Sequence, residues 1–247
     1  MTARIAVVMF PGSNCEHDVV EGLSRVGAKG EVVYHSETSL DGYDAVVVPG
    51  GFAHGDYLRP GAIARFSPVM AAVSEMAREG FPVIGICNGF QILTEAGLLP
   101  GALQKNSGLK FLCQTVELRI ETTASALTNK ARKGDRIQIP INHFEGNYTC
   151  DDATLARLKD EDRVVFRYTD NPNGARDDIA GICNEARNVV GLMPHPERAS
   201  DLLIGSDDGL VLLSSLVEAA GVSVSLAAGR PNSAAAERGA RPTPALS

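Results

Sequence analysis

Short apolar runs separated by amphipathic segments dominate the first hundred residues of the chain. Such runs are typical of strands buried in a parallel sheet, and here they predict strands over residues 4–10, 31–35, 43–48 and 83–86. Between them, apolar residues at three- and four-residue spacing predict a helix through Val19, Leu23 and Val26 that ends at Gly27, and another over residues 65–79. This alternation predicts crossover units and a parallel sheet with both faces covered.

The pattern changes after Gly101, where apolar and polar residues begin to alternate. Alternation at Val116, Leu118 and Ile120 is typical of a half-exposed antiparallel strand. Further short strands are predicted over residues 136–141, 164–168, 179–183 and 189–193, and a closing helix over residues 209–220. The whole pattern predicts an α/β fold: a three-layer, doubly wound, mostly parallel sheet flanked by helices, with added antiparallel strands.

The last part of the chain has a different composition. From about residue 223 it consists of Ala, Gly, Pro, Arg and Ser without apolar periodicity, which predicts a disordered tail over residues 223–247. We therefore expect a single folded domain over residues 1–222.

Charge and cysteine content narrow the function classes. With 23 basic and 30 acidic residues, the net charge is −7, which argues against partners such as nucleic acid and anionic membranes. No apolar stretch approaches the roughly 20 residues needed to span a bilayer, so we expect a cytoplasmic protein. The five cysteines are widely spaced and form no Cys-x-x-Cys pair, which predicts neither a disulfide framework nor a metal site. Cys113 and Cys183 lie in apolar surroundings and are predicted to be inert core residues.

The strand predicted at residues 83–86 ends in Gly85-Ile86-Cys87-Asn88-Gly89, and a helical pattern begins at Phe90. A nucleophile flanked by glycines at a sharp strand-to-helix turn is the nucleophile-elbow arrangement, here with Cys87 in place of serine. A helix N-terminus favours the thiolate, and the Asn88 N–H can help to bind an oxyanion. The alternative is a buried structural cysteine.

A nucleophile needs a base, and the base needs a residue that orients it. His195 and Glu197 follow the apolar strand 189–193 in Met-Pro-His-Pro-Glu. Two prolines are expected to hold this segment extended, and residues two apart in an extended chain project to the same side. We therefore predict a Cys87–His195–Glu197 triad; the alternative for His195 is an ordinary loop residue.

Other residues are weaker candidates. The pair Gly50-Gly51 follows a predicted strand and can supply a second oxyanion N–H, a contribution of roughly 3–4 kcal/mol. His143, at the end of an alternating strand, is a candidate for substrate contact, whereas His17, His35 and His54 have no partner at metal-ligand spacing. Neither a phosphate-binding Gly-x-x-x-x-Gly-Lys-Ser/Thr loop nor a Gly-x-Gly-x-x-Gly motif after the first strand occurs, so we predict no nucleotide site of these types.

The chain also resembles class I (triad) glutamine amidotransferases, which have a flavodoxin-like fold. The resemblance covers residue 4 to about residue 221, and its subfamily motifs point to the separate glutaminase subunits of phosphoribosylformylglycinamidine synthases. The similar stretches are Phe10-Pro11-Gly12-Ser13-Asn14-Cys15, Pro49-Gly50-Gly51-Phe52, Gly55-Asp56-Tyr57-Leu58-Arg59, residues 85–93 and Met193-Pro194-His195-Pro196-Glu197-Arg198. Two positions depart from the family pattern: tyrosine is common where His54 stands, and glycine is common where Phe144 stands.

On this resemblance, Cys87 forms a γ-glutamyl thioester with glutamine, His195 shuttles protons and Glu197 orients His195. The oxyanion hole and the substrate site would include Gly51, Phe52, Asn88, Gln91 and His143. The chain itself would bind no cofactor. Its ammonia would pass to a large synthetase subunit that uses ATP and Mg²⁺ to convert formylglycinamide ribonucleotide to formylglycinamidine ribonucleotide, and a very small third subunit would bridge the two.

Three other functions stay open at this point. A stress-response hydrolase or chaperone can also carry an elbow cysteine, but these proteins place their acidic partner before the cysteine, whereas Glu197 follows it. A regulatory binding module without catalysis is disfavoured by the complete triad. The same glutaminase chemistry serving a different acceptor synthetase is excluded only by the subfamily motifs.

Overall fold

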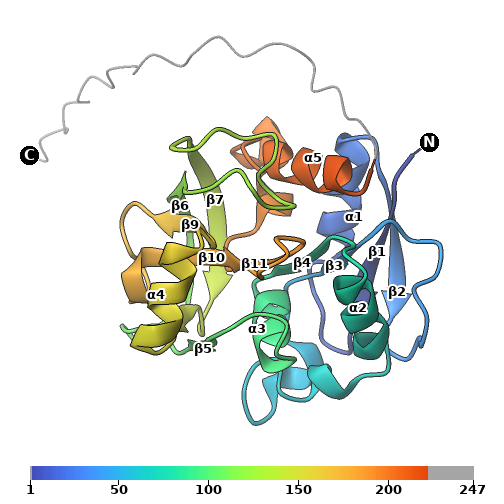
Figure 1. The fold of residues 1–247 in the computed structure, drawn as a ribbon, viewed down its shortest axis with the longest axis horizontal. Helices are drawn as coiled ribbons and strands as arrows, with labels where there is room; N and C mark the ends of the chain where they lie inside the picture. The colour runs from blue at the N-terminus through green and yellow to red at the C-terminus, as the bar shows by residue number, and fades with distance from the viewer. Residues whose placement is uncertain (1, 222–247) are drawn as a thin grey trace, which may run out of the picture.

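The computed structural model describes residues 2–221, which are built around a nine-stranded mixed sheet (Figure 1). In spatial order its strands are β2 (Lys29–Tyr34), β1 (Arg4–Met9), β3 (Ala45–Val48), β4 (Val83–Ile86), β11 (Val189–Leu192), β10 (Ile179–Cys183), β9 (Val164–Tyr168), β6 (Leu112–Ile120) and β7 (Arg136–His143). Pairing is parallel from β2 to β11 and antiparallel from β11 to β7. This confirms the predicted α/β architecture with added antiparallel strands.

Helices cover both faces of the parallel part. α1 (Glu16–Arg25) and α5 (Leu210–Ala219) pack against each other on one face, while α2 (Val69–Arg78) and α3 (Asn88–Glu95) lie on the other (Figure 1). Strands β3 and β4 are buried at every position, as their unbroken apolar runs predict. Because β4 lies between β3 and β11, its carboxyl end is at the centre of the sheet edge where α/β proteins place their ligands.

Three elements were not predicted from the sequence: strands β5 (Ala102–Gln104) and β8 (Asn147–Thr149), which pair with each other, and helix α4 (Asp152–Asp160). The strands are too short to show a period. In α4 only Leu158 is buried, so its apolar pattern is weak. A sequence signal did exist, because Asp151 caps the helix by accepting a 2.7 Å hydrogen bond from the Thr154 N–H.

The predicted helix over residues 65–79 is wrong at its start. Ala64–Phe66 form a short 3₁₀ turn, Ser67 is extended, and α2 begins only at Val69. The cause is Pro68, because a residue that precedes proline is disfavoured in the helical region. Phe66, which precedes this break, is 73% exposed.

The two cysteines assigned to the core have different outcomes. Cys183 is buried, and burial raises the pKa of its thiol to about 11. Cys113 is exposed, so its assignment to the core was wrong. In β6 the buried side chains are Val116, Leu118 and Ile120, and Cys113 falls on the opposite phase of the strand.

The expected disordered tail over residues 223–247 lies outside the described residues. Within residues 2–221, no helix combines the length and the apolar character needed to cross a membrane.

Candidate active site

Cys87 stands at the turn between β4 and α3 in a backbone conformation that few residues adopt. Its φ is 52° and its ψ is −107°, and such strain persists only where the surroundings enforce it. The flanking glycines allow close packing here: a Cβ on Gly89 would lie 1.8 Å from the Val48 carbonyl oxygen, and one on Gly85 would lie 2.6 Å from the Leu93 side chain. The sharp strand-to-helix turn that the sequence predicts is therefore present, with the thiol at the N-terminus of α3.

His195 reaches Cys87 because β11 is the parallel neighbour of β4. Leu192 pairs with Ile86, and the Leu192 carbonyl accepts a 2.8 Å hydrogen bond from the Cys87 backbone N–H. Three residues further on, the His195 N–H donates to the Pro140 carbonyl of β7 at 2.9 Å. The backbone of His195 is thus anchored to β7, and its side chain is buried, with the residue 1% exposed, and lines the same cavity as the thiol.

The segment that follows His195 differs from the extended conformation that was expected. Pro196–Ala199 form a 3₁₀ turn with proline in its first position, where the fixed φ of proline and its missing N–H suit a helix start. The prediction that the prolines keep this segment extended was therefore wrong. The expected pair forms nevertheless, because Glu197 Oε1 lies 2.6 Å from His195 Nδ1 and both side chains are buried.

The surroundings of His195 favour its charged form. Burial alone would lower its pKa, but the charges of Glu197 and Cys87, together with the nearby thiols of Cys15 and Cys87, raise that pKa well above its usual value. Within residues 2–221, His195 Nε2 is buried and has no hydrogen-bond partner. This nitrogen is therefore available to exchange a proton with the thiol or with a bound substrate.

The cavity next to these residues has a volume of about 210 Å³. Its walls are formed by Asn14, Cys15, Gly51, Phe52, Asp56, Pro60, Cys87, Gln91, Asn142, His143, Phe144, Glu145, His195 and Arg198. The structure thus brings most of the sequence-predicted site residues together. Glu197 and Asn88 stand behind the wall and support it.

Several residues of this wall, among them Cys15, Asp56 and Arg198, were not predicted as site residues from the sequence. Arg198 donates to the Cys15 sulfur at 3.2 Å and to Asp18 at 3.1 Å. The available sequence signal was their position within three of the stretches that carry the family resemblance. Because each of those stretches follows a strand of the parallel part, all three residues reach the same sheet edge.

Cys15, His195 and Glu197 also approach one another closely enough to be considered as metal ligands, with their donor atoms within 4.8 Å. The chemistry around them argues against a cation. Arg198 places a guanidinium on the Cys15 sulfur, and His195 Nδ1 is already bonded to Glu197. These donors fit an internal hydrogen-bonded cluster better than a metal site, and the absence of a metal stays a prediction.

Asn88 links the elbow to the loop after β3. Its side-chain oxygen accepts from the Ala53 N–H at 3.0 Å, and its nitrogen donates to Asp56 at 3.2 Å and to Gln91 at 2.8 Å. Gln91 in turn donates to the Glu145 carbonyl at 2.5 Å. Burial raises the pKa of Asp56 to about 6, the nearby Glu145 adds to the rise, and the hydrogen bond from Asn88 opposes it. These contacts fix the wall opposite His195.

His143 presents an acceptor to the cavity. The amide nitrogen of Asn106 donates to the carbonyls of Lys110 and His143, so its oxygen must accept the proton of His143 Nδ1, at 3.1 Å. His143 Nε2 therefore carries the lone pair, and no described residue bonds to it. Burial, reinforced by the charge of His195, lowers the pKa of His143 to about 4, which keeps the ring neutral.

Gly51 and Phe52 bring the end of β3 to the cavity. Gly51 has a φ of 147°, and a Cβ at this position would lie 2.7 Å from the backbone of Ser13 and Asn14. Phe52 anchors the segment by donating its N–H to the Gly12 carbonyl at 2.8 Å. Only glycine lets the two loops approach so closely.

The remaining histidines lie away from the reacting groups. His17 is exposed. His35 and His54 pack against each other with ring centroids 5.2 Å apart, and His54 is hydrogen-bonded to Ser67 at 3.2 Å. Their contacts are those of structural residues beneath the loop that follows β3.

Comparison with known proteins gives a consistent result. Residues 2–207 match the CobB/CobQ-like glutamine amidotransferase domain family. The chain is 55% identical over 219 residues to the phosphoribosylformylglycinamidine synthase subunit PurQ of Rubrobacter xylanophilus, covering 89% of this chain and 100% of that protein. It is 56% identical over 227 residues to the protein of the same name from Koribacter versatilis, covering 87% and 98%.

A solved structure agrees with these relatives. The fold matches a chain in the structure of PurLQS from Thermotoga maritima with a TM-score of 0.82 and 43% sequence identity, covering 88% of this chain and 99% of that chain. Fold and sequence thus agree over nearly the whole described part of the chain.

Proposed function

Because this chain belongs to the PurQ family, the class I glutamine amidotransferase subunits of phosphoribosylformylglycinamidine synthase, we propose that Cys87, His195 and Glu197 are its glutamine-hydrolysing triad. The observation that carries this proposal is the buried 2.6 Å pair of His195 and Glu197, whose histidine lines the same cavity as the strained Cys87. A thiol, a base and an orienting carboxylate in this order form the minimal set for acyl transfer.

The reaction follows from these positions. His195 Nε2 takes the thiol proton of Cys87, the sulfur attacks the side-chain amide carbon of glutamine, and the C–N bond breaks as Nε2 passes that proton to the departing nitrogen, which leaves as ammonia. Water then attacks the thioester carbon while His195 Nε2 takes up the water proton. His195 Nε2 passes this proton to the sulfur as the C–S bond breaks, which releases glutamate and restores the Cys87 thiol. Glu197 holds the His195 Nδ1 proton throughout, which fixes the ring and stabilises its charge.

The other proposed site residues stabilise the negative charge on the substrate oxygen and bind glutamine. The backbone N–H groups of Asn88 and Gly51 face the carbonyl oxygen that becomes negative in the intermediates. Gln91, Phe52 and His143 form the glutamine pocket, in which the neutral His143 accepts a hydrogen bond from a substrate N–H at Nε2. The acceptor character of that atom supports this role.

The ammonia serves a second active site. A large synthetase subunit would use it, with ATP and Mg²⁺, to convert formylglycinamide ribonucleotide to formylglycinamidine ribonucleotide, and a very small third subunit would bridge the two in the cytoplasm. The relatives at 55% and 56% identity bear the name of this one synthase, which favours this acceptor over another synthetase and disfavours the hydrolase and chaperone alternatives. The catalytic domain would end near residue 222, with residues 223–247 as an unstructured tail.

The decisive experiment replaces the nucleophile. Cys87→Ala should abolish glutamine-dependent synthesis by the assembled synthase, while synthesis from free ammonia continues at the wild-type rate. Cys113→Ala is the matched control, because Cys113 is an exposed cysteine on β6 and should leave both activities unchanged. If Cys87→Ala, still folded, retained glutamine-dependent synthesis, the proposal would be wrong.

A further inference from the structure

The segment between β3 and α2 carries a surface for a protein partner. This segment, Phe52–Phe66, is the cyan part of the ribbon that closes the bottom of the molecule in Figure 1, and we refer to it as the 52–66 loop. We propose that the 52–66 loop is the docking surface for the synthetase subunit that receives the ammonia. This inference rests on the proposed function and adds the place of contact.

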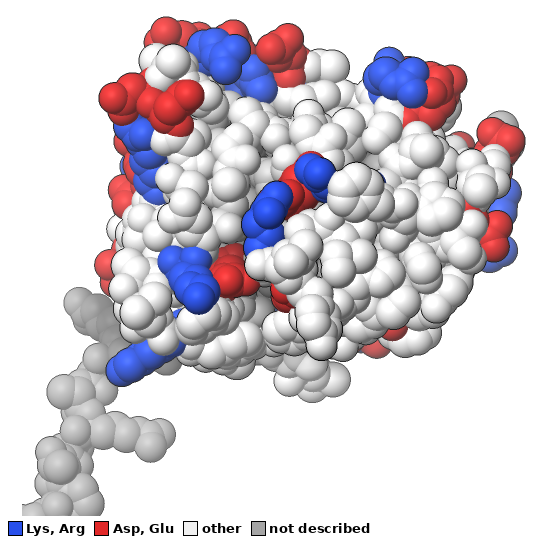
Figure 2. All heavy atoms as spheres, turned by 90° about the horizontal axis from the view of Figure 1, so that it is seen from below, with Lys and Arg blue, Asp and Glu red and all other residues white. Residues whose placement is uncertain are grey.

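The 52–66 loop exposes large apolar side chains to an unusual degree. Tyr57 is 74% exposed, Leu58 is 89% exposed and Phe66 is 73% exposed. Seen from this side, the molecule shows a broad surface of uncharged residues interrupted by only a few charged groups (Figure 2). Close to these side chains, Arg59 pairs with Glu95 at 2.6 Å. Exposed aromatic and aliphatic groups next to arginine pairs have the composition of a protein interface.

The backbone of the loop is held in place without these side chains. His54, Asp56 and Leu58 all have positive φ, at 54°, 51° and 71°, and non-glycine residues adopt such values only when other contacts enforce them. The enforcing contacts are polar and lie on the inner side of the loop: the His54 N–H donates to the Pro11 carbonyl at 2.6 Å, and Ala53 and Asp56 bond to Asn88. Tyr57 and Leu58 are thus held outward in a preformed arrangement, which lowers the entropy lost on association.

The exposed apolar surface of the 52–66 loop continues into the active-site cavity. Phe52, Asp56 and Pro60 form part of the cavity wall. The other exposed large apolar side chains of the described chain contribute no residue to that wall; they are Val32, Tyr34, Phe81, Leu109, Phe111 and Leu202–Ile204. Ammonia leaves from the cavity, so a subunit that must capture it gains most by covering the surface next to the cavity.

The hydrogen bonds between the 52–66 loop and Asn88 connect the proposed docking surface to the nucleophile. Asn88 follows the nucleophile directly, and its side chain bonds to both Ala53 and Asp56 on the underside of the loop. A partner that binds Tyr57 and Leu58 therefore contacts a loop that is hydrogen-bonded to Asn88, the residue next to Cys87. Hydrolysis of glutamine is then expected to accelerate when the synthetase is bound.

The test compares two exposed leucines. Leu58→Asp places a charge on the proposed surface, and aspartate tolerates the positive φ at this position. Leu203→Asp is the matched control, because Leu203 is 93% exposed in a segment that does not line the cavity. The dissociation constant for the cognate large synthetase subunit, with the small subunit present, would be measured by calorimetry on each full-length variant. We expect Leu58→Asp to weaken binding by at least about tenfold and Leu203→Asp by less than about twofold.

Three further measurements separate the possible failures. Hydrolysis of glutamine by the isolated variants should equal that of the wild type, and the acceleration by synthetase should be lost only in Leu58→Asp. Equal binding by the two variants, or a change in the oligomeric state of the isolated chain caused by Leu58→Asp, would overturn the docking surface. If the wild-type chain itself did not bind the synthetase, the proposed function would fail before the docking surface came into question.

Discussion

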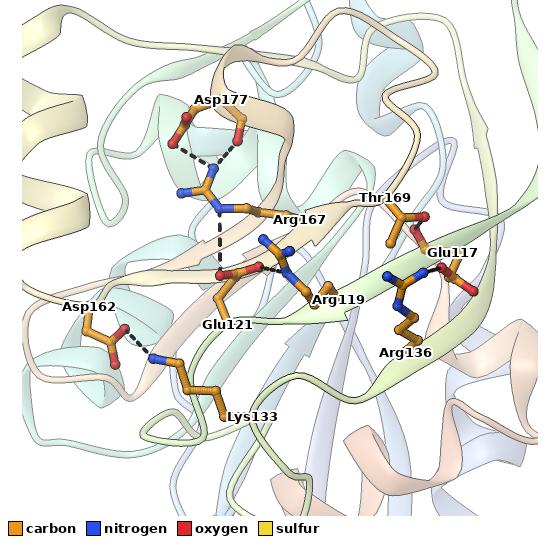
Figure 3. A network of polar contacts seen from close by, with 9 residues as sticks. All are labelled: Glu117, Arg119, Glu121, Lys133, Arg136, Asp162, Arg167, Thr169 and Asp177. Carbon is orange, nitrogen blue, oxygen red and sulfur yellow. Dashed lines mark hydrogen bonds and ion pairs between the residues drawn. The ribbon is translucent and has the colours of Figure 1, made fainter.

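Two of the places where charged side chains pair in the described part of this molecule differ strongly in burial. At the edge of the parallel part of the sheet, His195 and Glu197 lie 2.6 Å apart with 1% and 2% of their surfaces exposed. On the antiparallel part, strands β6, β7 and β9 and the turns beside them carry the network of ion pairs in Figure 3. Most of its distances resemble that of the buried His195–Glu197 pair.

Most of the pairs on the antiparallel part lie largely in water, whereas Arg167–Asp177 is partly buried, with side chains 16% and 29% exposed. Their distances are 2.5 Å for Arg119–Glu121, 2.7 Å for Arg136–Glu117, 2.6 Å for Arg167–Asp177 and 3.7 Å for Lys133–Asp162. Solvent screens exposed pairs, so that each typically contributes about 0–1 kcal/mol. A buried charge that loses its partner costs about 3–5 kcal/mol. Distance alone therefore does not tell a functional pair from a surface pair, whereas burial does.

The largest expected effect lies at the buried pair. Replacing the base in His195→Ala should lower the turnover number for glutamine hydrolysis by about 10²–10⁴-fold, the usual range for a general acid–base group. The matched control is His17→Ala, because His17 is exposed on α1 and should leave turnover unchanged. Steady-state kinetics on the two variants, with circular dichroism to verify folding, would check this. A variant of His195 with wild-type turnover would show that burial does not mark the catalytic histidine.

A smaller change keeps the shape of the pair and removes its charge. Glu197→Gln retains an oxygen near His195 Nδ1 but no longer stabilises the imidazolium, so the pKa of His195 should fall from its raised value. The limb of the pH–rate profile that reports His195 should move to lower pH, and turnover should drop by about 10–100-fold. The pH dependence of kcat for the variant and the wild type would measure this shift. An unmoved profile would mean that Glu197 acts only as packing.

Sequence reasoning reached the elbow because its chemistry depends on local residues. A Cβ on Gly85 or Gly89 would clash with the atoms packed against them, so both positions require glycine. The pairing of β4 with β11 brings Cys87 and His195 to the same edge of the sheet. The mistaken extended conformation after His195 did not affect the predicted pairing with Glu197, because Glu197 reaches His195 Nδ1 from a 3₁₀ turn. A pattern that specifies position can therefore be correct while the local conformation is wrong.

What could not be predicted depends on contacts between distant segments. Asp56 enters the cavity only because Asn88 and Ala53 fix the loop after β3. The tautomer of His143 depends on Asn106, which is 37 residues away in the chain. Short elements such as β5 and β8 acquire their structure from each other, and the three residues of each strand show no period of their own.

Asp56 is intermediate in burial between the buried His195–Glu197 pair and the exposed ion pairs. Its pKa is about 6 in the folded chain against 3.8 for the free side chain, so the folded state binds more protons than the unfolded state between these values. Stability should therefore fall as the pH rises from about 4 to about 6. Asp56→Asn, which keeps an acceptor for Asn88, should raise the free energy of unfolding at pH 7 by about 1–2 kcal/mol, a figure reduced for the partial exposure of this carboxyl.

Urea unfolding at pH 7 and at pH 4 would check this prediction, because the gain should vanish at the lower pH, where the wild-type carboxyl is protonated. Asp152→Asn is the control, since Asp152 lies on the exposed side of α4 and should show little gain at neutral pH. An equal gain at both pH values would point to packing instead of charge.

The smallest effect is expected on the exposed network. Lys133 Nζ lies 3.7 Å from Asp162, with the two side chains 68% and 53% exposed, so water competes fully for both charges. Lys133→Ala should change the free energy of unfolding by less than about 0.5 kcal/mol. A double-mutant cycle with Asp162→Ala, measured by urea unfolding at low and high salt, isolates the coupling between the two side chains. A coupling energy above about 1 kcal/mol that persisted at high salt would show that distance, and not burial, sets the strength of ion pairs in this fold.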